Sequence, residues 1–201
     1  RGAGATLAVF DSGIDYNITG GSSGPGPHPA FDNGAGQTRV VAHLVVNEAN
    51  HVNCNRLTTA QPRLCLPFPH SPPPNAGTVG YRPLVHAETC GHGTAMAAIS
   101  AGSSYQSFSG FGHAPDAMIV DVACSSLDNI PGQQLSAANP WVFTDEGYLG
   151  GIEELRTYIL LGNDVDVVNL SIAGRPSPDH PVSVALDSLA RQEDLLIVTN
   201  A

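Results

Sequence analysis

The sequence predicts an α/β fold in which a mostly parallel sheet is flanked by helices on both faces. Five short apolar segments support this prediction, because several are rich in valine and isoleucine with little alternation. Such segments are typical of strands that are covered on both faces. In the second half of the chain they alternate with helix-like segments, which indicates right-handed crossover connections.

The predicted strands are residues 6–10, 40–46, 118–123, 165–172 and 195–199. Three helices are predicted at residues 92–101, 145–161 and 181–192. The first is rich in alanine and is followed by Gly102, and the second is acidic and is followed by Gly162. The third has Pro181 at its first position, where the missing N–H costs nothing.

The composition is that of a globular protein, since 42% of the 201 residues are hydrophobic and 13% are charged. Residues 20–29 are rich in glycine, serine and proline, and residues 47–88 contain many prolines. Both stretches are typical of long surface loops. We therefore predict one domain over residues 1–201, with a proline-rich loop insertion at about 47–89.

The charge balance excludes two classes of partner. The formal net charge is −10, and all eight basic residues are arginines. Binding to phosphates or to an anionic membrane surface needs a cationic face. No apolar run approaches the roughly 20 residues that span a bilayer. We expect neither nucleic acid nor membrane as a partner.

The four cysteines are an even number in a loop-rich chain, which indicates disulfides and an oxidising, extracellular compartment. They are Cys54, Cys65, Cys90 and Cys124. Four cysteines permit three pairings, one of which joins Cys54 to Cys65 and Cys90 to Cys124, and the sequence does not choose among them. The alternative is four buried thiols. No CxxC pair occurs, so a zinc–thiolate site is not expected.

The first candidate site residue is Asp11, which directly follows the apolar segment Val9-Phe10 and precedes Ser12-Gly13. In open α/β sheets, ligands bind beyond the carboxyl ends of the strands. Asp11 is therefore placed to face a cleft. The alternative is a structural aspartate, because Asp-Ser-Gly also favours a turn.

The second candidate is His92, which stands between Gly91 and Gly93 and opens the alanine-rich helix. Flanking glycines allow backbone or substrate to approach the imidazole ring closely. A histidine held at a rigid helix start is suited to act as a general base near neutral pH. The alternative is a satisfied surface or core histidine.

Together the two motifs resemble the N-terminal part of the catalytic domain of the subtilases, the subtilisin-like serine proteases. The order Asp then His agrees with that family. Residues 112–117 (GHAPDA), 166–172 (DVVNLSI) and the strand that begins at residue 195 are also similar to family segments. The resemblance implies a subtilisin-like α/β fold that is incomplete in this chain, and a serine-type endopeptidase that cleaves polypeptides through an Asp-His-Ser triad.

The resemblance also implies individual roles. Asp11 would orient His92, and His92 would exchange a proton with a serine hydroxyl. The strand end formed by Ser171, Ile172, Ala173 and Gly174 would bind substrate, although Ala173 replaces the usual glycine of the family. The family's G-T-S-x-A-x-P segment does not occur in the sequence. We therefore expect the nucleophilic serine beyond the end of this chain, and we expect the 201-residue chain alone to be inactive.

Two other functions fit the same residues. One is a non-catalytic pseudoprotease or binding domain that keeps the fold. The other is a metal-dependent hydrolase, which is disfavoured because no third ligand stands at a suitable spacing from Asp11 and His92. The chemistry requires no cofactor. The resemblance to the subtilases leaves structural calcium open, because the family often binds it, but the scattered Asp15, Asp32 and Asp164 lack the spacing of a calcium loop.

Overall fold

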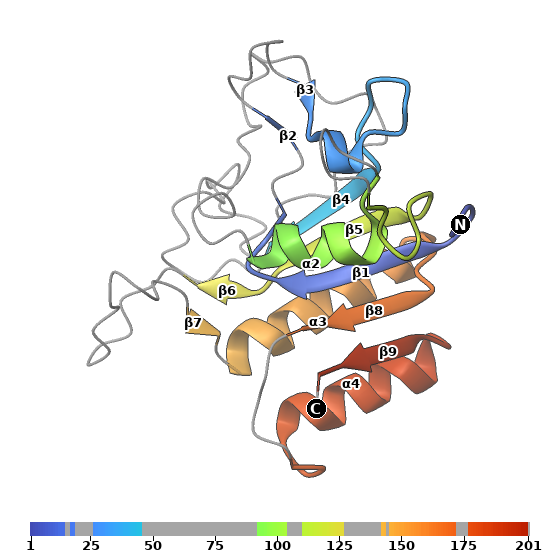
Figure 1. The fold of residues 1–201 in the computed structure, drawn as a ribbon. Coiled ribbons are helices and arrows are strands. Elements are labelled where there is room, and N and C mark those ends of the chain that lie inside the picture. The colour runs from blue at the N-terminus through green and yellow to red at the C-terminus, as the bar shows by residue number, and fades with distance from the viewer. Residues whose placement is uncertain are drawn as a thin grey trace, which may run out of the picture.

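The structure is a computed structural model, and it describes residues 1–14, 17–18, 26–45, 92–103, 110–126, 142–143, 145–171 and 177–200. Its centre is an all-parallel sheet with the strand order β4-β5-β1-β8-β9 (Figure 1). The strands are β1 (Thr6–Asp11), β4 (Val40–Val45), β5 (Met118–Ala123), β8 (Val167–Leu170) and β9 (Leu196–Thr199). Two short antiparallel pairs lie outside it, namely β2 (Asn17–Ile18) with β3 (Gly26–Pro27), and β6 (Ser125–Ser126) with β7 (Val142–Phe143).

Helices cover the sheet from two sides (Figure 1). Helix α2 (His92–Ala101) and the 3-10 turn η1 (Pro29–Phe31) pack on one face, where Leu7, Val9 and Ile119 are buried with Ala97. Helices α3 (Asp145–Leu160) and α4 (Pro181–Gln192) pack on the other face. The predicted three-layer α/β fold is thus confirmed.

The predicted elements agree with the observed ones to within about two residues at each end. Strand β8 is shorter than predicted, because Asp166 is exposed and its carboxylate accepts the Thr6 N–H at 2.7 Å, before the ladder begins. Helix α3 ends at Leu160, where Gly162 adopts a φ of 90° and closes the turn. The proline-rich insertion predicted at 47–89 lies outside the described residues.

The alternation of β1 decides which way its last residue points. Leu7 and Val9 face α2, whereas Ala8 and Phe10 face α3 and α4. Asp11 has the parity of Leu7 and Val9, so its side chain projects on the α2 face at the carboxyl end of the strand. The packing of the core therefore delivers a carboxylate to the start of α2.

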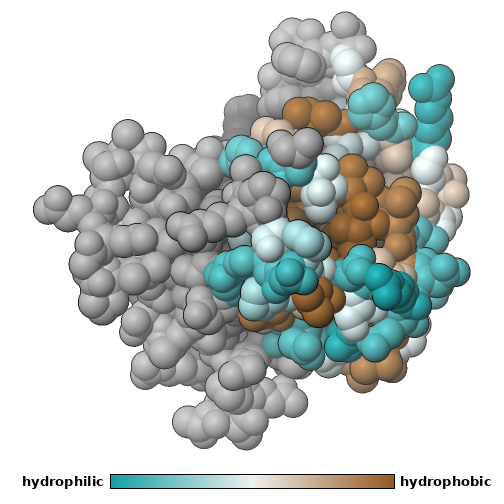
Figure 2. All heavy atoms as spheres, turned by 90° about the horizontal axis from the view of Figure 1, so that it is seen from below, coloured by the Kyte–Doolittle hydropathy of each residue, from teal (hydrophilic) through white to brown (hydrophobic). Residues whose placement is uncertain are grey.

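The edge strand β9 is the least covered part of the sheet. Leu196 and Val198 are exposed on it, and Val167, the register partner of Leu196, belongs to the α2 face. Figure 2 views the molecule from this edge and shows hydrophobic side chains gathered on the surface. Among the described residues, no helix has the length and apolar character needed to cross a membrane.

Candidate active site

Asp11 is completely buried at the carboxyl end of β1. Its Oδ1 accepts the backbone N–H of Ser12 at 2.7 Å, and the start of α2 lies directly against it. A helix N-terminus carries partial positive charge, and here it lies against the carboxylate together with the N–H donor. These neighbours allow a buried charge where desolvation alone would oppose one.

His92 begins α2, and its ring meets the Asp11 carboxylate. Nδ1 lies 2.8 Å from Oδ1 and 2.9 Å from Oδ2 of Asp11. An ionised carboxylate only accepts hydrogen bonds, so Nδ1 carries the proton and donates it. The ring is 45% exposed, and no described residue bonds to Nε2. The site therefore holds Nδ1 against Asp11, while Nε2 has no bond to a described residue.

The close approach of α2 to the β1 turn depends on Gly93. A Cβ at this position would lie 2.3 Å from the Gly13 carbonyl oxygen and 3.0 Å from the Asp11 Cβ. The Gly93 N–H donates to the Ser12 hydroxyl at 3.1 Å. Ser12 therefore ties both elements together, since its N–H binds Asp11 and its Oγ binds the helix. The sequence indicated close packing at Gly93, but it gave no signal for this second role of Ser12.

The family model of the subtilases matches residues 2–201, which is nearly the whole chain. The chain belongs to the subtilase family. Subtilases are serine peptidases, and their substrates are polypeptides. Comparison with curated proteins and with solved structures finds no match.

Behind the aspartate of this subtilase lies Cys124, which directly follows β5. Its N–H donates to the Asp11 carbonyl at 3.0 Å, and its Sγ lies 3.6 Å from the same oxygen. Burial raises the pKa of the Cys124 thiol well above its usual value, and the Asp11 charge adds to this shift. A thiol of this kind supports the strand end but is not an activated nucleophile.

Cys124 is a free thiol, so the Cys90–Cys124 pairing considered from the sequence is wrong. The physical reason is its position in the sheet interior, where it caps the carbonyl of Asp11. Cys54, Cys65 and Cys90 lie outside the described residues. The described part of this subtilase therefore gives no support to a disulfide framework.

Of the four residues predicted to bind substrate, the structure describes only Ser171. It follows β8 at the same edge of the sheet as Asp11, is half-buried, and its Oγ accepts the Asn169 amide at 2.8 Å. Ile172, Ala173 and Gly174 lie outside the described residues. The position of Ser171 agrees with a strand that borders the site, and its role in binding stays a prediction.

Two of the acidic residues considered for calcium, Asp32 and Asp164, belong to no cluster of possible metal ligands among the described residues. Asp32 Oδ1 accepts the N–H groups of Gly34 and Gly36, which orders the loop after η1. Asp164 is exposed at the far end of the sheet, and Asp15 lies outside the described residues. Within the ranges that the structure describes, no three His, Cys, Asp or Glu side chains are close enough to hold a metal ion.

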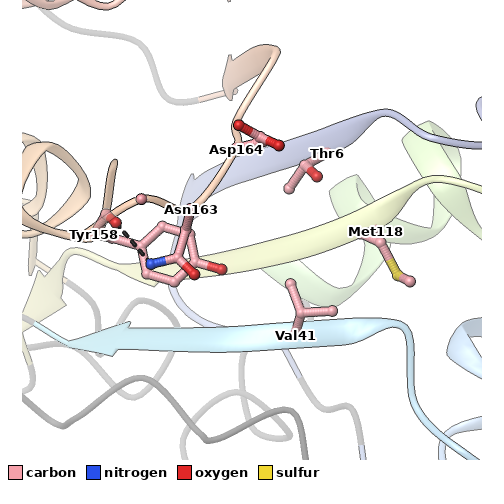
Figure 3. Close-up of a pocket in the computed structure, with 7 residues that line it drawn as sticks. Thr6, Val41, Met118, Tyr158, Asn163 and Asp164 are labelled. Carbon is pink, nitrogen blue, oxygen red and sulfur yellow. Dashed lines mark hydrogen bonds between the residues drawn. The ribbon is translucent and has the colours of Figure 1, made fainter. Parts of the chain in front are cut away.

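A hollow of about 280 Å³ lies at the opposite end of the sheet from Asp11 (Figure 3). It is lined by Thr6, Val41, Met118, Tyr158, Gly162, Asn163 and Asp164. Thr6 is the first residue of β1 and Asp11 is the last, so the full length of the strand separates the two places. The hollow is therefore not part of the candidate active site.

Two residues near the site escaped the sequence analysis. His43 and Asp121 each stand inside an otherwise apolar strand, β4 and β5 respectively. Their side chains form a buried pair, with Nδ1 2.5 Å from Oδ2. The signal that could have found them is a lone ionisable residue in each buried strand, because such residues are rarely buried without a partner.

Proposed function

We propose that this subtilase is a serine-type endopeptidase in which Asp11 and His92 are two members of an Asp-His-Ser triad. The serine would be supplied by a polypeptide segment outside these 201 residues. One observation carries the proposal: the half-exposed His92 ring binds a buried carboxylate through Nδ1, which leaves Nε2 without a bond to any described residue.

Asp11 would act on His92 by orientation and charge. Its carboxylate holds the proton on Nδ1, which keeps Nε2 in the basic form. When Nε2 takes up a proton, the ring becomes a cation beside a buried anion. This interaction stabilises the imidazolium, while Asp11 itself stays ionised throughout.

His92 would move the proton between the reacting groups. Nε2 removes the proton from the serine hydroxyl as its oxygen attacks the peptide carbonyl, and the tetrahedral intermediate forms. The same nitrogen then returns the proton to the leaving amine, which breaks the C–N bond and leaves an acyl-enzyme. In the second half, Nε2 takes a proton from water as the water oxygen attacks the acyl carbonyl. It returns this proton to the serine oxygen as the ester bond breaks and the carboxylic acid product leaves.

The experiment uses the polypeptide translated from the complete gene and a fluorescent phosphonate that reacts with activated serines. We expect the wild-type protein to be labelled on one serine. We expect His92→Ala to lose the label, because the hydroxyl then has no base. His113→Ala is the matched control, since His113 is exposed on the neighbouring loop and should leave labelling unchanged.

Two results would overturn the proposal. Labelling that survives His92→Ala would show that another group activates the serine. A complete gene product with no labelled serine and no peptide hydrolysis would favour the non-catalytic alternative. The 201-residue chain itself should show neither labelling nor hydrolysis, and turnover by a clean preparation of it would show that its own residues include a nucleophile.

A further inference from the structure

We propose that Asp121 and His43 are positioning residues that hold the turn of residues 11–14 in the shape required by the Asp11–His92 pair. The inference rests on the proposed function for its kinetic consequence. Its structural part concerns only the described residues, and the test of that part does not require catalytic activity.

The pair is built into two neighbouring strands of the sheet. His43 in β4 is the register partner of Asp121 in β5, and both side chains lie on the α2 face. The carboxylate is fully buried and the ring is 7% exposed. Nδ1 and Oδ2 are 2.5 Å apart, which is a short hydrogen-bond distance.

Asp121 reaches from this pair into the turn that follows Asp11. Its Oδ2 also accepts the backbone N–H of Ile14 at 3.0 Å. Ile14 is buried, and Gly13 before it has a φ of 107°, which only glycine adopts without strain. The Ile14 N–H belongs to no strand ladder, so Asp121 satisfies a buried donor at the point where the chain leaves the sheet.

The turn transmits this anchor to the candidate active site. Asp11 lies at its start, Ser12 donates to Asp11 and accepts from Gly93, and Asp121 fixes its end. Three neighbouring strands thus place one residue each on the α2 face: His43 and Asp121 in register, and Asp11 two positions beyond Val9, the β1 register partner of Asp121. The Asp11 carboxylate is therefore positioned by strand β1, which carries it, and by the turn that follows, which Asp121 anchors at Ile14.

Packing alone does not explain a charge in this place. The other residues of β5 are apolar, and a valine or leucine would fill the volume without desolvation. Asp121 Oδ1 is buried, and among the described residues it has no hydrogen-bond partner. The hydrogen bond from the buried Ile14 N–H best explains why a carboxylate is kept here despite the cost of its desolvation, because an apolar side chain would offer that N–H no acceptor.

The structural test uses the 201-residue chain and the proton NMR signal of His92 Nδ1–H. A ring N–H bonded to a buried carboxylate exchanges slowly with water. We expect Asp121→Ala to speed this exchange by at least about tenfold, because a loosened turn lets the Asp11–His92 bond open. Asp166→Ala is the matched control, since Asp166 also accepts a backbone N–H, but that of Thr6 at the far end of β1.

The kinetic test uses the product of the complete gene. We expect Asp121→Ala to lower kcat by about 10- to 100-fold with KM nearly unchanged, because displacement of a catalytic group costs turnover rather than binding. His43→Leu should also lower kcat, whereas His43→Asn should restore most of it. Asparagine places an N–H donor near the position of Nδ1, so it keeps the bond to Asp121 without the ring.

The exchange and kinetic measurements together can overturn the positioning role of Asp121 and His43. A folded Asp121→Ala protein with unchanged exchange and unchanged kcat would overturn the proposal, even if its thermal stability fell. If that variant does not fold, Asp121→Asn, which keeps an oxygen acceptor for Ile14, is compared with His43→Leu, which removes the bond to Asp121. We expect slower exchange of the His92 Nδ1–H in Asp121→Asn than in His43→Leu. Equal exchange rates in the two variants would also overturn the proposal. If His92→Ala stays active while Asp121→Ala speeds exchange, the proposed function fails and the positioning role stands.

Discussion

Two aspartate–histidine pairs lie on the same face of the sheet and share the same bond, from a ring Nδ1 to a carboxylate oxygen. In one pair the histidine is a strand residue, and both side chains are buried. In the other the histidine begins a helix beyond the strand ends, and its ring is 45% exposed. The same hydrogen-bonded pair of side chains is thus buried in one place and partly exposed to solvent in the other.

The difference teaches that the Asp–His bond by itself does not make a site for acid–base chemistry. A general base must reach the proton that it takes, which requires a free nitrogen at the surface of a cleft. His92 meets this condition because α2 starts where β1 ends. His43 does not meet it, since its ring is buried, and the carboxylate of its partner Asp121 instead binds the Ile14 backbone N–H.

The largest expected difference between the two pairs is in turnover. In the complete gene product, His92→Ala should lower kcat by about 10⁶-fold, the loss that removal of the base causes in subtilisin. His43→Asn should lower it by less than about tenfold, since the bond to Asp121 is kept. Steady-state hydrolysis of a peptide substrate measures both. Losses of equal size would contradict the assignment of roles.

Replacement of the two aspartates by asparagine should also lower kcat by different amounts, with the larger loss at Asp11. Asp11→Asn should lower kcat by about 10⁴-fold, because an amide N–H facing Nδ1 favours the tautomer in which Nε2 carries the proton. Asp121→Asn keeps an oxygen acceptor for Ile14 and should cost far less. A pre-steady-state measurement of acylation distinguishes them, and a slower acylation in Asp121→Asn than in Asp11→Asn would reverse the comparison.

The approach of α2 to β1 should be sensitive to a single methyl group. Gly93→Ala places a Cβ 2.3 Å from the Gly13 oxygen, which is backbone and must shift. We expect a loss of about 1 to 3 kcal/mol in the free energy of unfolding, measured with urea on the 201-residue chain. Ala95→Ser on the exposed side of α2 is the control and should change it by less than about 0.5 kcal/mol.

His28 should produce the smallest effect, and it differs from both pairs because its Nδ1 accepts a bond, from Ala30 N–H at 3.2 Å. Burial lowers the pKa of His28 in the folded protein. The unfolded state therefore binds the proton more readily, and this contribution to stability is complete above about pH 6.5 and is lost as the pH falls further.

Urea unfolding at about pH 7.5 and about pH 5.5 measures this contribution of His28. His28→Asn keeps an acceptor at the start of η1 and should flatten the dependence between the two pH values. An equally steep dependence in that variant would assign the acid sensitivity to other groups.

Most of the fold could be predicted because it depends on local pattern. The apolar strands and the helix signals at Gly102, Gly162 and Pro181 gave element bounds close to the observed ones. Asp11 and His92 could be placed because each stands at the boundary of such an element. The strand order could not be read, since it depends on contacts between segments far apart in the chain.

The hydrogen bonds that position the residues of the candidate active site could not be predicted from the sequence for the same reason. The bond from Asp121 to Ile14 joins residues 107 positions apart, and the bond from Gly93 to Ser12 joins residues 81 apart. Neither has a local signature. Cys124 shows the opposite failure, because counting cysteines favoured a disulfide where the sheet places a free, buried thiol.

The most direct test of the central claim is to map the histidine that a substrate-like alkylating reagent modifies. A peptidyl chloromethyl ketone, added to the active product of the complete gene, delivers its alkylating carbon to the base beside the bound peptide. Digestion and mass spectrometry should find the adduct on His92 and leave His43 unmodified. An adduct on His43, or full inactivation with His92 unmodified, would contradict the account.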